Sequence, residues 1–161
     1  MLKNYKCENE KMNLDDYLKL YKYVRDNMIH PFTKEEIEEI LLTGGKIWLY
    51  YDNKNLVCSM FYMPIEKKIL LKHNVDLEEN FVGSLGPIMV SPDYVGHGLQ
   101  REMMNVLVNY CRSINKKYIF TKVCSDNVYS LNNMLKCDFK VVDQYINERG
   151  SNTALIKKLE K

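Results

Sequence analysis

The segment from residue 89 to residue 101 constrains the fold of this chain most strongly, because it predicts a strand, a tight turn and a helix start in succession. An apolar run over residues 85–90 stops at Pro92, and Gly96 and Gly98 then open a long amphipathic pattern. Glycine adopts backbone angles closed to other residues and lets a ligand approach the main chain. The N–H groups that begin a helix, at the positive end of its dipole, bind phosphate. The segment therefore predicts a site that holds a phosphorylated ligand by backbone amides.

A Gly-x-Gly pair alone says little, since many turns use glycine for steric reasons only. Here the surrounding order is Val-x-Pro-x-Tyr-x-Gly-x-Gly-Leu, beginning at Val90. This order resembles the acyl-CoA-binding segment of the GNAT family of N-acetyltransferases, whose fingerprint is Gln/Arg-x-x-Gly-x-Gly/Ala. Gly98 takes the first glycine of the fingerprint, and Gly96 the small residue before it. Two positions depart from it, with Val95 in place of Gln or Arg and Gln100 in place of the last Gly or Ala.

A second segment resembles the same family. After the apolar run 118–124, Asn127 and Ser130 stand at the offsets of the family's Asn-x-x-Ala/Ser. Phe139 matches the closing Gly-Phe, with Asp138 in place of the glycine. Two motifs in the expected order are far more specific than either one alone. The resemblance is close over residues 84–140 and extends to the N-terminal half only in the order of its elements.

The resemblance implies transfer of an acyl group, most simply acetyl, from coenzyme A to an amine of a small molecule or peptide, in one ternary complex. It implies that amides of the glycine turn hold the diphosphate and that the preceding strand pairs with the pantetheine arm, where one amide faces the thioester oxygen. The residues assigned to acetyl-CoA binding are Ile88, Met89, Val90, Gly96, His97, Gly98, Leu99, Gln100, Arg101, Asn127 and Ser130. Of these, His97 and Arg101 are auxiliary contacts or simply exposed.

No general acid can be assigned from the sequence. The tyrosine that serves as acid in the best-known members lies seven residues after the motif asparagine, and that position is Met134. Ser130 is the one hydroxyl on the same predicted helix face, although a serine there more often packs or bonds locally. Since a thiol has a pKa near ~8.5, water can also protonate the leaving thiolate.

No general base can be assigned from the sequence either. Residues 84–90 contain no carboxylate, although family bases often lie there. Glu66 and His73 fall in the connection 64–80, which has no clear pattern and would border the acceptor site. We expect both to be solvated side chains, with the amine losing its proton through water.

The predicted fold class is mixed α/β in one domain, residues 1–161. The order is strand, two helices, three strands, helix, strand, helix and two strands. The resemblance assigns it to a GNAT-like fold, a mostly antiparallel sheet with splayed parallel middle strands flanked by helices. The boundaries come from local signals. The first helix is expected to be capped by Asn13 and to stop at Pro31, with Tyr17, Tyr21, Val24 and Met28 at helical spacing between them, and the second has a capping box at Thr33 and Glu36 and a stop at Gly44 and Gly45. The elements expected further along the chain are a hairpin of strands 47–51 and 56–63, a helix 99–114 and strands 140–147 and 153–159.

Composition excludes several classes of protein. A formal net charge of +2 does not favour nucleic-acid binding. The five cysteines are odd in number and scattered, and the three histidines lie far apart, so neither a disulfide framework nor a metal site is expected. Without an 18-residue apolar run or a signal-peptide stretch, no membrane association is expected and the chain is predicted to be cytoplasmic, as a monomer or homodimer. Two alternatives stay open: an acyl-CoA-binding sensor or partner module with little or no turnover, and an unrelated α/β nucleotide binder.

Overall fold

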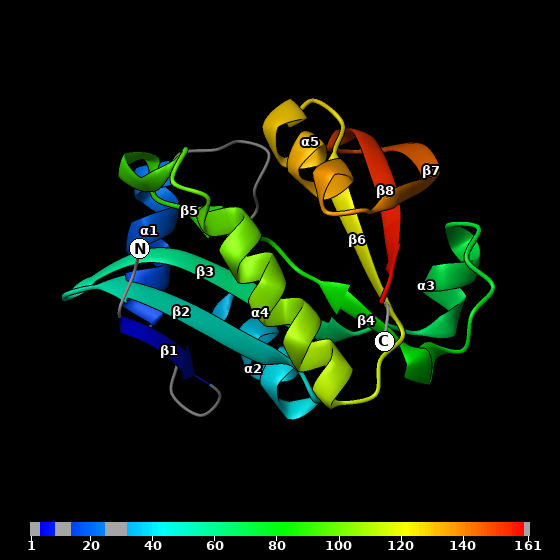
Figure 1. The fold of residues 1–161 in the computed structure, drawn as a ribbon, viewed down its shortest axis with the longest axis horizontal. Coiled ribbons are helices and arrows are strands. Elements are labelled where there is room, and N and C mark those ends of the chain that lie inside the picture. Colours follow the sequence, from blue (N-terminus) through cyan, green and yellow to red (C-terminus); the bar gives the residue numbers. More distant parts are fainter. Residues whose placement is uncertain (1–3, 9–13, 25–31, 160–161) are drawn as a thin grey trace. The chain divides into compact units, whose positions relative to one another are not determined.

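The computed structural model describes residues 4–8, 14–24 and 32–159 (Figure 1). The chain packs as two compact units. Unit 1 comprises Met1–Met63 and Gly86–Met103, and unit 2 comprises Pro64–Leu85 and Met104–Lys161. A single functional domain over residues 1–161 stays a prediction.

Unit 1 is a small antiparallel sheet covered by helices. Its elements are β1 (Asn4–Glu8), α1 (Leu14–Val24), α2 (Lys34–Leu42), β2 (Lys46–Asp52), β3 (Asn55–Pro64), β5 (Met89–Val90), the 3-10 turn η2 (Pro92–Tyr94) and the first turn of α4 (Leu99–Ser113). β1 pairs with β2, β2 with β3, and β3 with β5, all antiparallel. The core joins both helices to the sheet through Tyr17, Leu20, Ile37, Ile47, Leu49, Phe61 and Met89.

Local signals in unit 1 are confirmed where the structure describes them. The Thr33 hydroxyl accepts from the Glu36 amide at 3.2 Å, and the Glu36 carboxylate accepts from the Thr33 amide at 3.2 Å, which is the predicted capping box. α2 ends before Gly44, and strands β2 and β3 form the predicted hairpin. The proposed cap and stop of the first helix, Asn13 and Pro31, lie outside the described residues, as does Met28.

Unit 2 is a four-stranded mixed sheet. Its elements are α3 (Lys67–Lys72), the 3-10 turn η1 (Glu79–Phe81), β4 (Val82–Leu85), the rest of α4, β6 (Tyr118–Cys124), α5 (Val128–Lys136), β7 (Lys140–Asn147) and β8 (Gly150–Lys158). β4 and β6 are parallel, whereas β6–β8 and β8–β7 are antiparallel. α3 lies on one side of this sheet and α5 on the other (Figure 1). The side under α3 has a core of Ile65, Leu70, Val75, Val82, Phe120 and Ala154.

The predicted fold class, a mixed α/β sheet flanked by helices, is confirmed, but the predicted strand 85–90 is wrong in its extent. The structure has two strands, β4 and β5, separated by residues 86–88. Pro87 cannot donate to a ladder, and a Cβ on Gly86 would lie 2.9 Å from Phe61 Cβ. The parallel pairing therefore ends at Leu85 with Thr121, and Ile88 belongs to neither strand.

The connection 64–80, which shows no pattern in the sequence, contains α3 and η1. A six-residue helix is too short to show a reliable 3.6-residue period. Burial holds it in place, because Leu70 is fully buried and Val75 nearly so. This segment is therefore an ordered part of unit 2.

Candidate functional site

The glycine turn in unit 1 has the predicted backbone. Gly96 has φ 87° and Gly98 has φ 76°, both in the left-handed region that disfavours side chains. A Cβ built on either residue would meet no atom within 4 Å. The turn thus needs glycine for its conformation, and the space beside both residues is open to a ligand.

The turn leads directly into α4. The first bond of this helix runs from the Glu102 amide to the Gly98 carbonyl at 3.0 Å. The N–H groups of Leu99 and Arg101 precede that bond and so have no acceptor within the helix. Together with the helix dipole they suit a diphosphate. The Leu99 side chain is buried, which leaves its main chain for a ligand.

Strand β5 offers a second main-chain feature. Val90 and Met89 pair with Cys58 and Ser59 of β3, and no other described strand pairs with β5. One edge of β5 therefore keeps main-chain groups that an extended ligand arm can bind. The Met89 side chain is fully buried, so this residue can serve a ligand only through its backbone.

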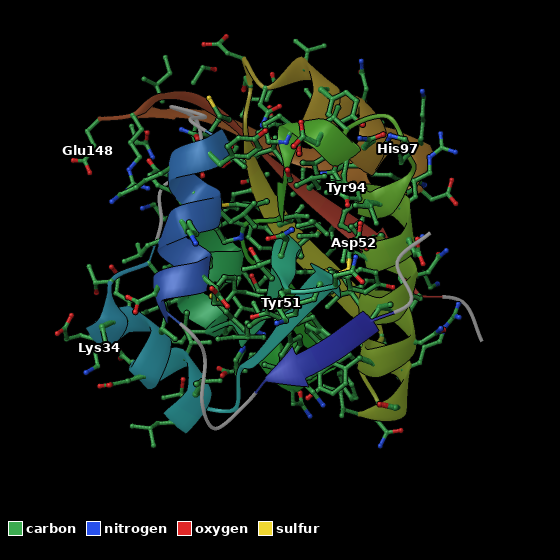
Figure 2. All side chains as sticks on the ribbon, turned by 90° about the vertical axis from the view of Figure 1, so that its left-hand side faces the viewer. Lys34, Tyr51, Asp52, Tyr94, His97 and Glu148 are labelled. Carbon is green, nitrogen blue, oxygen red and sulfur yellow. The ribbon has the colours of Figure 1, made fainter. Side chains whose placement is uncertain are left out.

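The segment before the glycine turn is anchored by two phenol–carboxylate hydrogen bonds. The Tyr94 hydroxyl donates to Asp52 at the end of β2, with His97 further along the same turn (Figure 2). The Tyr23 hydroxyl donates to Asp93 at 2.8 Å. These hydrogen bonds raise the pKa of Tyr94 and of Tyr23, so both phenols remain donors at neutral pH. His97 is exposed, with its ring centroid 6.3 Å from that of Tyr94, and Arg101 is also exposed.

Unit 1 also contains a cavity of about 1030 Å³ between α1, the β2–β3 turn and η2. Its lining residues are Asp16, Lys19, Leu20, Lys22, Tyr23, Lys54, Asn55, Leu56, Val57, Ser91, Asp93 and Tyr94. None of the residues predicted to bind acetyl-CoA lines it, although Ser91 and Tyr94 precede the glycine turn. The cavity is therefore a feature distinct from the predicted contacts.

In unit 2, the predicted helix after Asn127 is confirmed. The Asn127 side-chain oxygen accepts from the Ser130 amide at 3.2 Å and caps α5. Met134, at the position of the family's tyrosine, is buried, and so is Phe139. Asp138 has φ 67°, a left-handed conformation that explains why the family has glycine there.

The expectation that His73 is solvated is wrong. Only 3% of His73 is exposed, and its Nδ1 lies 2.9 Å from Oδ2 of Asp143 on β7. Its ring stacks on Phe120 at 5.7 Å and contacts Tyr145 at 4.6 Å between centroids. Sequence reasoning missed this pair because its two members are 70 positions apart. Glu66 is exposed and lies 3.3 Å from the Lys68 ammonium, as expected for a solvated carboxylate.

Cys58 lies beside the proposed ligand strand, because it pairs with Val90. It is fully buried, and burial raises the pKa of its thiol well above the usual range. A thiol held protonated is a poor nucleophile. Burial likewise raises the pKa of Cys111 to about 12. The Cys58 thiol is therefore poorly suited to attack a thioester.

Within the part of the chain that the structure describes, no three His, Cys, Asp or Glu side chains gather as a metal site. Nor does any helix there have the length and apolar character needed to span a bilayer.

The sequence matches the model of the acetyltransferase (GNAT) family over residues 13–139. The chain belongs to the GNAT family. No curated protein matched its sequence. Among solved structures it is similar to a probable acetyltransferase from Staphylococcus epidermidis, at TM-score 0.76 and 16% identity, with 98% of this chain and 99% of that one covered.

Two further solved structures are similar in fold. The yncA protein of Salmonella typhimurium, solved with its cofactor acetyl-CoA, has TM-score 0.69 and 13% identity, covering 98% of this chain and 95% of that chain. A mutant spermidine N-acetyltransferase from Vibrio cholerae has TM-score 0.67 and 14% identity, with 96% of this chain and 94% of that chain covered. At such identities the likeness establishes the fold, and this GNAT chain is an acetyltransferase by family.

Proposed function

We propose that this GNAT protein transfers an acetyl group from acetyl-CoA to an amine of a small molecule or peptide, by direct attack in a ternary complex. The observation that carries the proposal is the turn Gly96–Gly98, whose two positive φ angles and open surroundings lead into the Leu99 and Arg101 amides of α4, which have no acceptor within the helix. A turn of this kind binds a diphosphate through its main chain.

Each predicted contact then has a role. The Leu99 and Arg101 amides bind the diphosphate, and Gly96, His97, Gly98 and Gln100 remain proposed contacts around it, although the His97 amide also donates to the Tyr94 carbonyl at 3.4 Å. The open edge of β5 at Met89 and Val90, with Ile88 before it, binds the pantetheine arm. One of these amides donates to the thioester oxygen as negative charge develops on it. Asn127 and Ser130, which belong to unit 2, remain proposed cofactor contacts.

In the reaction, the amine nitrogen attacks the thioester carbonyl carbon, a C–N bond forms and the C–S bond breaks. The amine proton leaves to water, and the thiolate takes a proton from water, either directly or through the Ser130 hydroxyl, which gives up its proton as it receives one from water. No oxidation or reduction occurs, and no metal is needed. Orientation of the two substrates and main-chain stabilisation of the oxygen supply most of the rate acceleration.

A second candidate function is a binding module that senses acyl-CoA with little or no turnover. Two observations favour it: Met134 is buried where the family's acid would stand, and residues 84–90 hold no carboxylate. The family match removes the third alternative, an unrelated nucleotide binder. Release of free coenzyme A over a broad amine panel separates the enzyme from the module.

Acetyl-CoA is expected to stabilise the folded protein, because the amides and the strand edge bind it only when they are arranged by the fold. At a hundredfold excess over the dissociation constant the gain in unfolding free energy is about 2.7 kcal/mol. A thermal-shift titration with acetyl-CoA measures this gain. An unchanged melting temperature at saturating acetyl-CoA would contradict both candidate functions.

Replacement of Ser130 by alanine is expected to slow turnover less than ~100-fold, at or below the lower end of positioned acid catalysis. Thiolate is already a fair leaving group near neutral pH, so water can protonate it. Steady-state rates with acetyl-CoA and an accepted amine measure the effect, and the rate should rise with pH as the amine deprotonates. A loss above a thousandfold with unchanged acetyl-CoA affinity would make Ser130 an essential acid.

Cytoplasmic location, a monomeric or homodimeric state, and the absence of nucleic-acid and membrane partners stay predictions.

A further inference from the structure

The glycine turn has little internal support for its own conformation. Gly96 and Gly98 both have positive φ angles, and glycine can leave such angles as easily as it adopts them. The main-chain bonds donated by the Val95 and His97 amides are long, each with 3.4 Å between nitrogen and oxygen. Ordinary N–H···O bonds are about 2.7–3.2 Å long. The turn therefore depends on contacts with other elements to keep the conformation that presents amides to a ligand.

Side-chain hydrogen bonds hold both ends of the turn on strand β2. Before the turn, the Tyr94 hydroxyl donates to the Asp52 carboxylate (Figure 2). After the turn, the Tyr50 hydroxyl donates to Oε1 of Glu102 in α4 at 3.3 Å. Tyr50 and Asp52 are two positions apart on one strand, so their side chains lie on the same face, with Cα atoms roughly 7 Å apart. These four residues, which we call the β2 bracket, all belong to unit 1 and hold residues 95–101 at both ends.

The bond between Tyr50 and Glu102 is partly shielded from water. Only 5% of Tyr50 is exposed, and loss of water, followed by the Glu102 charge, raises the pKa of its phenol. After burial, the Glu102 charge also raises the pKa of the Cys58 thiol, and Cys58 lies opposite Tyr50 on β3. Tyr50 therefore stays a donor at neutral pH, and the Glu102 carboxylate lies toward the sheet.

The placement of Glu102 also matters for an anionic ligand. Glu102 is the acidic residue in the first turn of α4. A carboxylate at the start of a helix interacts favourably with the dipole, and so competes with a diphosphate for the same positive end. The bond from Tyr50 engages this carboxylate on the side of β2. Glu102 is thereby held by the sheet rather than left free at the positive helix end.

We propose that the β2 bracket positions the glycine turn for acetyl-CoA. Tyr50 and Asp52 are then positioning residues, because they act on the cofactor only through the turn that they hold. The inference rests on the proposed function, since it concerns the cofactor site of that reaction. When only a fraction of the molecules has the binding conformation, the apparent dissociation constant rises by the inverse of that fraction. The bracket keeps this fraction high.

Breaking either end of the bracket is expected to weaken acetyl-CoA binding. With about one molecule in ten left in the binding conformation, Tyr50→Phe and Asp52→Ala should each raise the dissociation constant about tenfold in isothermal titration. With an amine that the wild-type protein acetylates, KM for acetyl-CoA should rise likewise while kcat stays within about twofold, because the turn is ordered once the cofactor is bound. Asp52→Asn keeps an acceptor oxygen for Tyr94 and should bind acetyl-CoA within about threefold of wild type.

Tyr51→Phe is the matched control. Tyr51 lies between Tyr50 and Asp52 on β2 and, since side chains alternate, on the opposite face. Its hydroxyl donates to Asp16 of α1 at 3.0 Å, a bond of the same kind that has no part in the turn. The control should lower the melting temperature about as much as Tyr50→Phe and leave acetyl-CoA affinity within about twofold of wild type. Equal losses of affinity in the two variants would overturn the bracket as a positioning device.

A measurement without cofactor tests the bracket directly. Backbone nitrogen relaxation of the full, ligand-free chain reports the order of residues 96–98. Order parameters are expected to be about 0.85 in wild type and Tyr51→Phe, and about 0.6 in Tyr50→Phe and Asp52→Ala. Equal order parameters in wild type and in the two bracket variants would contradict the inference.

The failures of the two proposals are distinguishable. If wild type binds acetyl-CoA and both bracket variants bind it equally tightly, the bracket is overturned and the acetyltransferase proposal stands. If wild type binds no acetyl-CoA although the bracket orders its glycine turn, the proposed function is overturned instead.

Discussion

Valine at position 98 is expected to abolish acetyl-CoA binding, with the affinity falling more than ~100-fold, or about 2.7 kcal/mol. Gly98 has φ 76°, and a β-branched residue is strained there by roughly 1–3 kcal/mol. A Cβ at this position meets no protein atom within 4 Å, so the protein can still fold. The added methyl groups instead occupy the open space proposed for the diphosphate. Isothermal titration with acetyl-CoA measures the loss.

The chain offers a matched control for Gly98→Val. Gly150, in the β7–β8 turn, also has a positive φ, 108°, and also has no atom within 4 Å of a built Cβ. Gly150→Val therefore imposes the same kind of backbone strain at a residue that is not among the proposed cofactor contacts. It should lower the melting temperature comparably while acetyl-CoA affinity stays within about twofold of wild type. Equal affinity losses in both variants, or none in a folded Gly98→Val protein, would remove the glycine turn from the site.

Removal of the Asp143 carboxylate is expected to lower the free energy of unfolding by about 2–3 kcal/mol, since it leaves a buried imidazole without its partner. The side chains of His73 and Asp143 are only 4% and 20% exposed, so water cannot fully replace the lost contact. For a chain of this size the melting temperature should fall by roughly 5–10 °C. Thermal and urea unfolding of Asp143→Ala measure the change.

An exposed ion pair provides the comparison. Lys67 and Glu78 lie 2.8 Å apart, with side chains 32% and 67% exposed. Glu78→Ala should cost less than ~1 kcal/mol, because solvent screens such pairs. Asp143→Asn, which keeps a hydrogen-bond acceptor, should recover part of the loss. If Asp143→Ala were no more harmful than Glu78→Ala, the buried pair would not be what holds α3 on the sheet.

Local features could be predicted from the sequence wherever the physical cause lies within a few residues. The capping box of Thr33 and Glu36 depends on one helical turn, and the positive φ angles of Gly96 and Gly98 depend on the absence of a Cβ. The helix after Asn127 depends on a side chain that caps its own first turn. These elements appear where the sequence places them.

The sequence-based predictions of secondary structure were wrong or missing where an element is fixed by contacts with residues distant along the chain. The apolar run 85–90 reads as one strand, yet Gly86 and Pro87 divide it, and Met89 pairs with Ser59 of β3. Strand partners are chosen by packing across the sheet, which periodicity along one segment does not encode. For the same reason a short helix such as α3 leaves no readable pattern.

By itself, the sequence determined the family, the order of most elements and the glycine turn proposed to bind the cofactor, because each depends on residue types at short fixed spacings. Only the tertiary structure decided that His73 is buried against Asp143, 70 positions away. The physical reason is that burial and charge depend on which segments the fold brings together, and these contacts join segments that no local pattern connects.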